Sequence, residues 1–225
     1  LCARNPAGGA IRAITKDPGY DSSVELGAKA GTDDYSQLSV LAGGPLSDAF
    51  RGQIASWFEK RDGLATNLVP SGRSHADDLD RQSLRAKLLW DVGERVTAKL
   101  GASWWRYTDW IGRDLVSTGA PETNRGVALY GGITSLDREH FASALEGDND
   151  MRETALDLRF DVDAGELKFV SITSYTESDF FQTFDTDLSS MTLLDNYATE
   201  TSTDVSQELQ LLCAGDGPLE WIAGA

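Results

Sequence analysis

Few residues in this chain could do chemistry, and they form no familiar catalytic set. The two histidines are His75, in the stretch GRSHADD, and His140, in DREHFAS. Each has carboxylates nearby, but neither has a second histidine four residues further on, as a helical metal site requires. We expect both histidines to lie in surface loops and to hold no metal.

Other catalytic and cofactor motifs are also missing from the sequence. It contains neither the nucleophile motif G-x-S-x-G nor a glycine-rich phosphate loop. The run GDND at 147–150 lacks the ligand spacing and the distal glutamate of a calcium loop. Cys2 and Cys213 fit no metal motif, and they can pair only if the fold brings their Cβ atoms together. We therefore expect no enzyme and no bound cofactor or metal.

Composition narrows the possible partners. The chain has 36 Asp and Glu against 20 Lys and Arg, a net charge of −16, and its basic residues are not clustered. A nucleic-acid groove needs clustered Lys and Arg, so nucleic acid is not an expected partner. No stretch approaches the roughly 18 apolar residues of a spanning helix. A transmembrane β-barrel stays possible, because its strands alternate apolar and polar residues.

From Ser22 onward the sequence alternates with a period of two, which is typical of β-strands with two different faces. One predicted face is apolar, and we expect it to contact lipid: Leu26, Val40, Ile54, Leu88, Leu100 and Leu158. The other is charged and is expected to face a lumen: Glu25, Lys29, Arg51, Arg85, Lys87, Lys99 and Arg159.

Every second connection between these strands is short, and those between are mostly long. Short turns occur at GPLSDA, DVGE, DAGE and AGDGP, while the links at 61–80, 108–150 and 181–203 are long. A soluble sandwich gives no reason for this rule, whereas a membrane barrel has short turns at one rim and long loops at the other. Aromatic residues at strand ends fit interfacial girdles: Tyr35, Trp57, Phe58, Trp104, Trp105 and Tyr107.

The first residues, LCARNPAGGAIRAITKDP, resemble the end of the plug domain of TonB-dependent outer-membrane receptors. The matching positions are Arg4, Asn5, Gly8, Gly9, Ala10, Ile14, Thr15, Lys16 and Pro18. GPLSD at 44–48 is similar to the first periplasmic turn of that family, and DVSQELQL at 204–211 to a recurrent barrel strand. Cys2 and Ala3 depart from the pattern, which has an aromatic residue and glycine there.

This resemblance implies an all-β fold, with an antiparallel transmembrane β-barrel portion behind a short plug remnant. Residues 1–20 would be the end of the plug, with Arg4, Asn5, Gly8 and Gly9 at its hinge, and 21–225 the first part of the barrel. The family barrel has about 22 strands, of which we expect eight complete strands and part of a ninth. Because the chain lacks an initiator Met, we expect a piece of a longer protein.

The function implied by the resemblance is active uptake of a scarce, bulky nutrient across the bacterial outer membrane. Iron-siderophore complexes, cobalamin, haem and oligosaccharides are the family's substrates. The implied partners are outer-membrane lipid, the TonB complex, acting through a region not in this chain, and a small-molecule ligand such as an iron chelate.

The stretch SWWRYTDWIGRD at 103–114 is the expected ligand contact, because it begins the longest link. Aromatic rings offer stacking surfaces and guanidinium groups offer charge for an anionic or chelated group. The candidate ligand-binding residues are Trp105, Arg106, Tyr107, Trp110 and Arg113. The alternative for these aromatic residues is a place in the outer girdle.

Two other functions stay open at this point. A soluble all-β carbohydrate-binding module or polysaccharide-active enzyme would also suit long loops that contain Trp and Tyr. Such a protein would dissolve in buffer, whereas a barrel piece needs detergent or urea. A passive porin or autotransporter-like barrel is disfavoured by the plug-like first residues.

Overall fold

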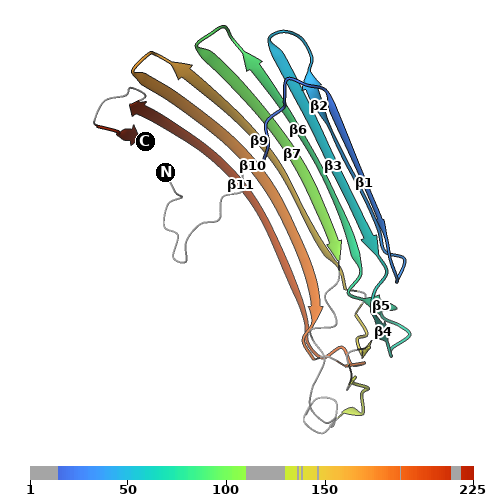
Figure 1. Ribbon diagram of the computed structural model, residues 1–225. Coiled ribbons are helices and arrows are strands. Elements are labelled where there is room, and N and C mark those ends of the chain that lie inside the picture. Colours follow the sequence, from blue (N-terminus) through green and yellow to red (C-terminus); the bar gives the residue numbers. More distant parts are fainter. Residues whose placement is uncertain are drawn as a thin grey trace.

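The computed structural model describes residues 15–109, 130–135, 137, 139–145, 147–187, 189–213 and 219–225. Among these residues, nine strands form one strongly curved antiparallel sheet, and three short strands form a second sheet beyond one end of it (Figure 1). No helix among them is long and apolar enough to cross a membrane.

The large sheet follows chain order wherever its strands are long. Its order is β1-β2-β3-β6-β7-β9-β10-β11-β12, and every neighbouring pair is antiparallel. The strands are β1 (Ser23–Ala30), β2 (Ser36–Pro45), β3 (Phe50–Arg61), β6 (Leu79–Asp91), β7 (Val96–Asp109), β9 (Asn149–Asp163), β10 (Leu167–Asp185), β11 (Asp195–Cys213) and β12 (Ile222–Gly224). Eight complete strands and a short ninth confirm the predicted count.

The short turns lie at one rim, as predicted. The turns after β2, β6 and β9 are all at the upper end in Figure 1, and the fourth, AGDGP, falls outside the described residues. Gly93 and Gly165 adopt positive φ angles of 79° and 81° in DVGE and DAGE. Glycine reaches such angles without the steric cost of a Cβ atom, so these turns stay tight. We call this end of the sheet the turn rim.

The long connections meet at the opposite end. The link between β3 and β6 forms β4 (Ala65–Asn67) and β5 (His75–Ala76), and the link after β7 forms β8 (His140–Phe141). Strand β4 pairs with both, antiparallel to β5 and parallel to β8. Ala65, Ala76 and Phe141 form a small buried core between them. Two loops far apart in sequence are thereby joined into one unit.

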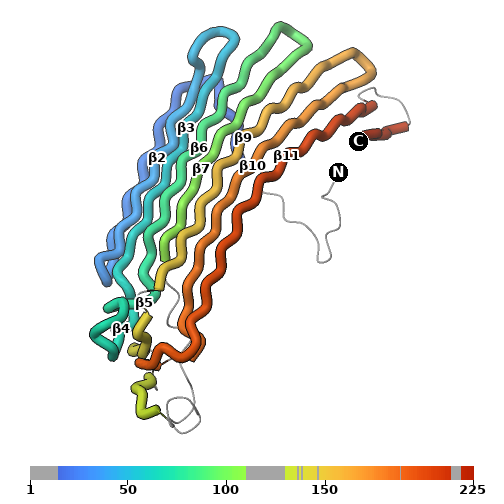
Figure 2. The backbone as a smooth tube through the Cα atoms, turned by 180° about the vertical axis from the view of Figure 1, so that it is seen from behind, coloured from blue at the N-terminus to red at the C-terminus, as the bar shows by residue number. Residues whose placement is uncertain are grey.

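The register separates the two sets of residues that the alternation predicted. Leu100 of β7 is directly opposite Leu88 of β6 and Leu158 of β9, so these side chains share a face. Lys99, one residue earlier, points to the other face and is opposite Arg159. We call the face of Leu100 the outer face and the face of Lys99 the inner face. Figure 2 shows the same single layer of strands from behind.

The described residues place no second sheet on the outer face. Leu26 is 77% exposed and Leu100 is 46% exposed, although both are large and apolar. A sandwich would bury one face of each sheet against the other, and the described residues do not show that arrangement. Soluble proteins rarely leave so wide an apolar face uncovered.

The apolar part of the outer face is bounded by aromatic residues at two levels. Near the turn rim, Phe50 stacks on Trp90 with ring centroids 5.4 Å apart. Phe58, Trp104 and Tyr175 each lie eight residues beyond the turn-rim end of their strand, and we call them the far belt. Eight residues span about 27 Å along a strand, or about 21 Å of height at a tilt of about 40°. That height is close to the apolar band of a membrane barrel.

Candidate binding surface on the inner face

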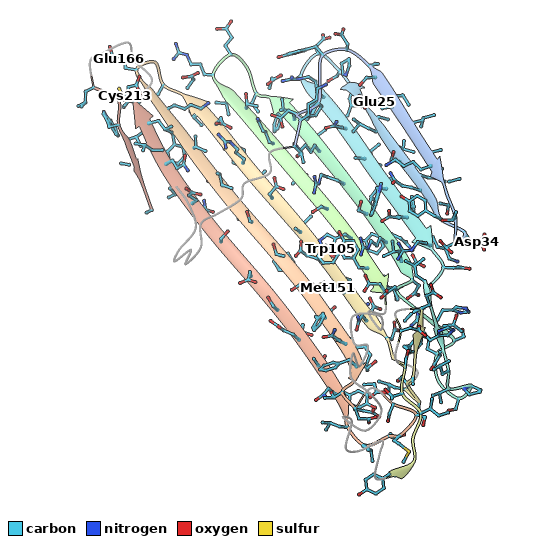
Figure 3. All side chains as sticks on the ribbon, turned by 60° about the horizontal axis from the view of Figure 1, so that its bottom comes forward. Glu25, Asp34, Trp105, Met151, Glu166 and Cys213 are labelled. Atoms are coloured by element: carbon cyan, nitrogen blue, oxygen red, sulfur yellow. The ribbon has the colours of Figure 1, made fainter. Side chains whose placement is uncertain are left out.

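Two neighbouring rows of cross-strand residues make a hollow on the inner face. One row runs through Gly27, Ser39, Trp57, Ser83 and Trp105, and the next through Glu25, Leu41, Ala55, Arg85 and Ser103. Residues of both rows line a depression of about 500 Å³. Small side chains leave the space, and the indoles of Trp57 and Trp105 are part of its lining. Figure 3 labels Trp105 and Glu25 on the sheet.

Trp105 is held in place by two contacts. Its indole Nε1–H donates a hydrogen bond to Glu153 Oε1 at 3.0 Å. Its ring lies 4.7 Å from that of Tyr107, centroid to centroid, with the planes tilted by 34°. Both aromatic residues come from β7, two positions apart, and the strand period therefore puts them on the same face.

A cation completes this aromatic group. The Arg81 guanidinium lies 5.3 Å from the centroid of the Tyr107 ring, within the range of a cation–π contact. An ion pair with Asp109 at 3.2 Å holds the same guanidinium from the side. We call Trp57, Arg81, Trp105 and Tyr107 the inner aromatic group. It offers flat surfaces for stacking and a positive charge.

The segment before β1 lies against the inner face closer to the turn rim. Lys87 Nζ donates to the carbonyl oxygens of Thr15 at 2.8 Å and Lys16 at 3.1 Å. The Asp17 carboxylate accepts from Lys87 at 3.3 Å and from Lys99. Side chains predicted to face a lumen thus hold the chain that enters the sheet.

Arg51 fixes the next residues of the same segment. Its Nη1 donates to the carbonyl oxygen of buried Pro18 at 3.3 Å, and its guanidinium lies 4.0 Å from the Tyr20 ring centroid. An ion pair with Asp91 at 2.9 Å orients the guanidinium. We call residues 15–20 with their three basic partners the anchor.

Two neighbouring lysines determine the direction of the pKa shift of Asp17. Burial by itself raises the pKa of this carboxyl, but the hydrogen bonds and charges of Lys99 and Lys87 lower it below its ordinary value of 3.8. A lowered pKa in the folded state stabilises the fold above pH 3.8. That stabilisation is lost as the pH falls through the lower, folded-state pKa.

Comparison with solved structures identifies the fold, while no protein-family model and no curated protein matches the chain. The ferric yersiniabactin uptake receptor FyuA of Yersinia pestis covers 93% of this chain with a TM-score of 0.72 at 13% identity. The siderophore receptor PiuA of Acinetobacter baumannii covers 91% with a TM-score of 0.68 at 12% identity. The ferric-catecholate import receptor Fiu of E. coli K12 covers 89% with a TM-score of 0.58 at 14% identity.

The chain has the fold of siderophore receptors. It spans about a third of their length, namely 31% of FyuA, 29% of PiuA and 32% of Fiu. The predicted all-β, antiparallel fold class is thereby confirmed, and the sheet is open among the described residues.

Within this receptor fold, the predicted ligand residues do not stay together. Trp105 and Tyr107 lie on the inner face, but Arg106 lies on the outer face. There its Nε and Nη2 donate hydrogen bonds to the Asp150 carboxylate at 3.0 and 2.7 Å. Trp110 and Arg113 fall outside the described residues. So do Cys2 and the predicted hinge residues, which are Arg4, Asn5, Gly8 and Gly9. Cys213 is a free thiol beside the turn rim.

The alternation also divides the predicted girdle. Phe58 and Trp104 lie on the outer face and belong to the far belt. Trp57, Trp105 and Tyr107 lie on the inner face, so a girdle on the outer face does not explain them. Arg81 and Glu153 were not predicted at this surface. Cross-strand register makes them neighbours, and a single strand read alone carries no sign of that.

Candidate metal ligands have other roles. His140 Nδ1 contacts Asp137 at 2.9 Å, and this contact lowers the pKa of the Asp137 carboxyl. Oxygens of Asp185, Asp187 and Asp195 lie within 4.8 Å of one another. Asp187, however, accepts the backbone N–H groups of Leu193 and Leu194 and shapes its own loop. Apart from the carboxylates themselves, no described feature of the His140 contact or of the three aspartates indicates a metal ion.

Proposed function

We propose that this chain is the first part of the barrel wall of a TonB-dependent receptor that imports an iron chelate across the bacterial outer membrane. Residues 1–20 would be the end of the plug domain and 21–225 the wall. The observation that carries the proposal is the division of the sheet into an apolar outer face and a charged inner face that holds the entering segment. Its role is transport and not catalysis.

An iron chelate is the preferred substrate within this proposal. The names of FyuA, PiuA and Fiu all refer to siderophores or ferric complexes. The inner aromatic group supports the same class, because a ferric catecholate combines flat rings with negative charge. An indole can stack on the flat rings, and a nearby guanidinium can attract the negative charge.

Uptake by cells tests the proposal directly. The gene for the full-length protein is deleted in its host, and accumulation of radiolabelled iron is measured from ferric yersiniabactin and from a ferric catecholate. We expect the deletion to abolish iron accumulation from one of these two chelates. Removal of the TonB complex should abolish the same accumulation. Unchanged uptake of both, together with a protein that extracts into buffer without detergent, would favour the soluble carbohydrate-binding alternative.

Removing the inner aromatic group should weaken ligand binding. We expect Trp105→Ala with Tyr107→Ala to lower the affinity of the full-length receptor for its ferric chelate by about tenfold to a hundredfold, as loss of a stacked aromatic anchor does. Affinity is measured by fluorescence quenching on purified receptor. The matched control is Trp104→Ala on the outer face of the same strand, which should keep its affinity. Equal losses for both variants would place ligand binding elsewhere.

A further inference from the structure

One asparagine side chain joins two of the long links. The Asn67 Nδ2 group donates to the carbonyl oxygens of Arg73, in its own link, and of Ser143, in the link after β7, both at 2.8 Å. Its Oδ1 accepts from the backbone N–H groups of Val69 at 3.0 Å and Ser143 at 3.2 Å. An amide side chain has two donor hydrogens and two acceptor positions. Asn67 therefore uses its full capacity, half within its own link and half across to the other.

The backbone beside Asn67 fits closely against the second link. Leu68 donates its N–H to the carbonyl oxygen of Phe141 at 2.8 Å, next to the small core. Ser143, which bonds Asn67 from the other side, is only 2% exposed. A Cβ atom added at Gly72 would collide with the Ser143 carbonyl oxygen, so a residue without a side chain is needed for the two links to approach this far.

Arg73 fastens the same two links a second time. Its Nη1 donates to the Gly147 carbonyl oxygen at 3.0 Å, while its guanidinium pairs with Asp78 and lies 3.8 Å from the Asp148 carboxylate. Asp148 is in turn bound to the end of β10, because its carbonyl oxygen accepts the Thr183 N–H at 2.9 Å and its own N–H donates to the Thr183 hydroxyl at 2.7 Å. The links are thus tied to each other and to the sheet.

We propose that Asn67 couples the two links, so that this end of the sheet opens and closes as one body and not link by link. A separate movement of either link would leave the half-buried Asn67 amide and the buried Ser143 N–H without their partners. An unsatisfied buried polar group costs more than its hydrogen bond contributes, whereas a movement of both links together keeps these bonds. We call this body the clasp, namely residues 65–76, 139–145 and 147–148.

The clasp does not depend on which ligand is transported. The long links lie at the end of the sheet opposite the turn rim (Figure 1), from which a ligand would enter within the proposed function. Coupling between two sites is reciprocal, so whatever orders one of these links orders the other as well.

Hydrogen exchange of the full-length protein in detergent micelles tests the clasp. Asn67→Ala removes the four side-chain hydrogen bonds without adding a charge. We expect amide exchange to become about tenfold to a hundredfold faster in residues 65–76, and by a similar factor in residues 139–145 of the other link. Amides of the long strands between the turn rim and the far belt should keep their rates.

Another asparagine supplies the matched control. The described hydrogen bond of the Asn196 side chain is to Thr186, within the link at 181–203. Asn196→Ala therefore removes a side-chain amide of the same kind without breaking a contact between the two links of the clasp. Exchange in residues 65–76 and 139–145 should not change in this variant.

A substitution in the second link tests the coupling in the opposite direction. Asp137 accepts the N–H groups of Glu139 and His140 at 2.9 and 2.8 Å, so these bonds stay within its own link. Asp137→Ala should speed exchange in residues 139–145 by about tenfold, and in residues 65–76 by the same factor.

Three results would overturn the clasp. In the first, Asn67→Ala and Asp137→Ala each speed exchange only in their own link. In the second, Asn196→Ala speeds exchange in both links as much as Asn67→Ala does. In the third, exchange becomes faster throughout the long strands as well, so that the links do not open separately from the sheet. These rates are independent of iron accumulation, so the clasp and the proposed function can fail separately.

Discussion

Arginine in place of Leu100 is expected to destabilise the full-length protein by about 2–4 kcal/mol, the cost of such a charge near the middle of a bilayer. Leu100 lies on the outer face between the two aromatic levels, is 46% exposed and has Leu88 and Leu158 directly opposite. An arginine there has no carboxylate across either strand to pair with. The free energy of unfolding, from a urea titration of the full-length protein in lipid vesicles, measures the effect.

The adjacent residue supplies the control for this prediction. Lys99→Arg keeps a positive charge on the inner face, next to the Asp17 carboxylate, and should change the free energy of unfolding by less than about 0.5 kcal/mol. Equal losses at positions 99 and 100 would show that the two faces do not meet different solvents, and the membrane assignment would then fail.

The two-faced sheet could be predicted because every strand repeats the same local signal. Leu100 and Lys99 lie on opposite faces because they are adjacent in one strand. In a single-layer sheet, residues directly opposite each other on neighbouring strands share a face, so the alternation continues across the sheet. The turn rim could be predicted as well, because the glycines of DVGE and DAGE mark where one strand ends and the next begins. These are properties of a few consecutive residues, which a sequence shows directly.

Contacts between distant segments could not be predicted in this way. Strand β4 pairs in parallel with β8, which follows more than seventy residues later, and neither segment is long enough to show a period. Asp17 meets Lys87 and Lys99 across similar separations. The separation of Arg106 from Trp105 and Tyr107 is different, because alternation within one strand already places Arg106 on the other face.

Reversing the charge of Asp17 is expected to release the anchor. Asp17→Lys removes the carboxylate that accepts from Lys87 and Lys99 and sets a third ammonium group beside them. Hydrogen bonds to charged groups contribute about 1.5–3 kcal/mol each, and the Asp17 side chain is 43% exposed, so screening reduces the total loss to about 2 kcal/mol. Unfolding titrations of the full-length protein and hydrogen exchange at the amides of residues 15–20 measure it.

A charge swap separates this ion pair from general disruption of the segment. Asp17→Lys combined with Lys99→Asp restores opposite charges between residue 17 and β7, so at least half of the lost stability and exchange protection should return. Asp21→Lys is the control, because Asp21 is exposed and contacts neither lysine through any described hydrogen bond. If the swap recovers nothing while Asp21→Lys costs as much as Asp17→Lys, the segment is sensitive to any added charge. The inner-face lysines would then not be what fixes residues 15–20 to the sheet.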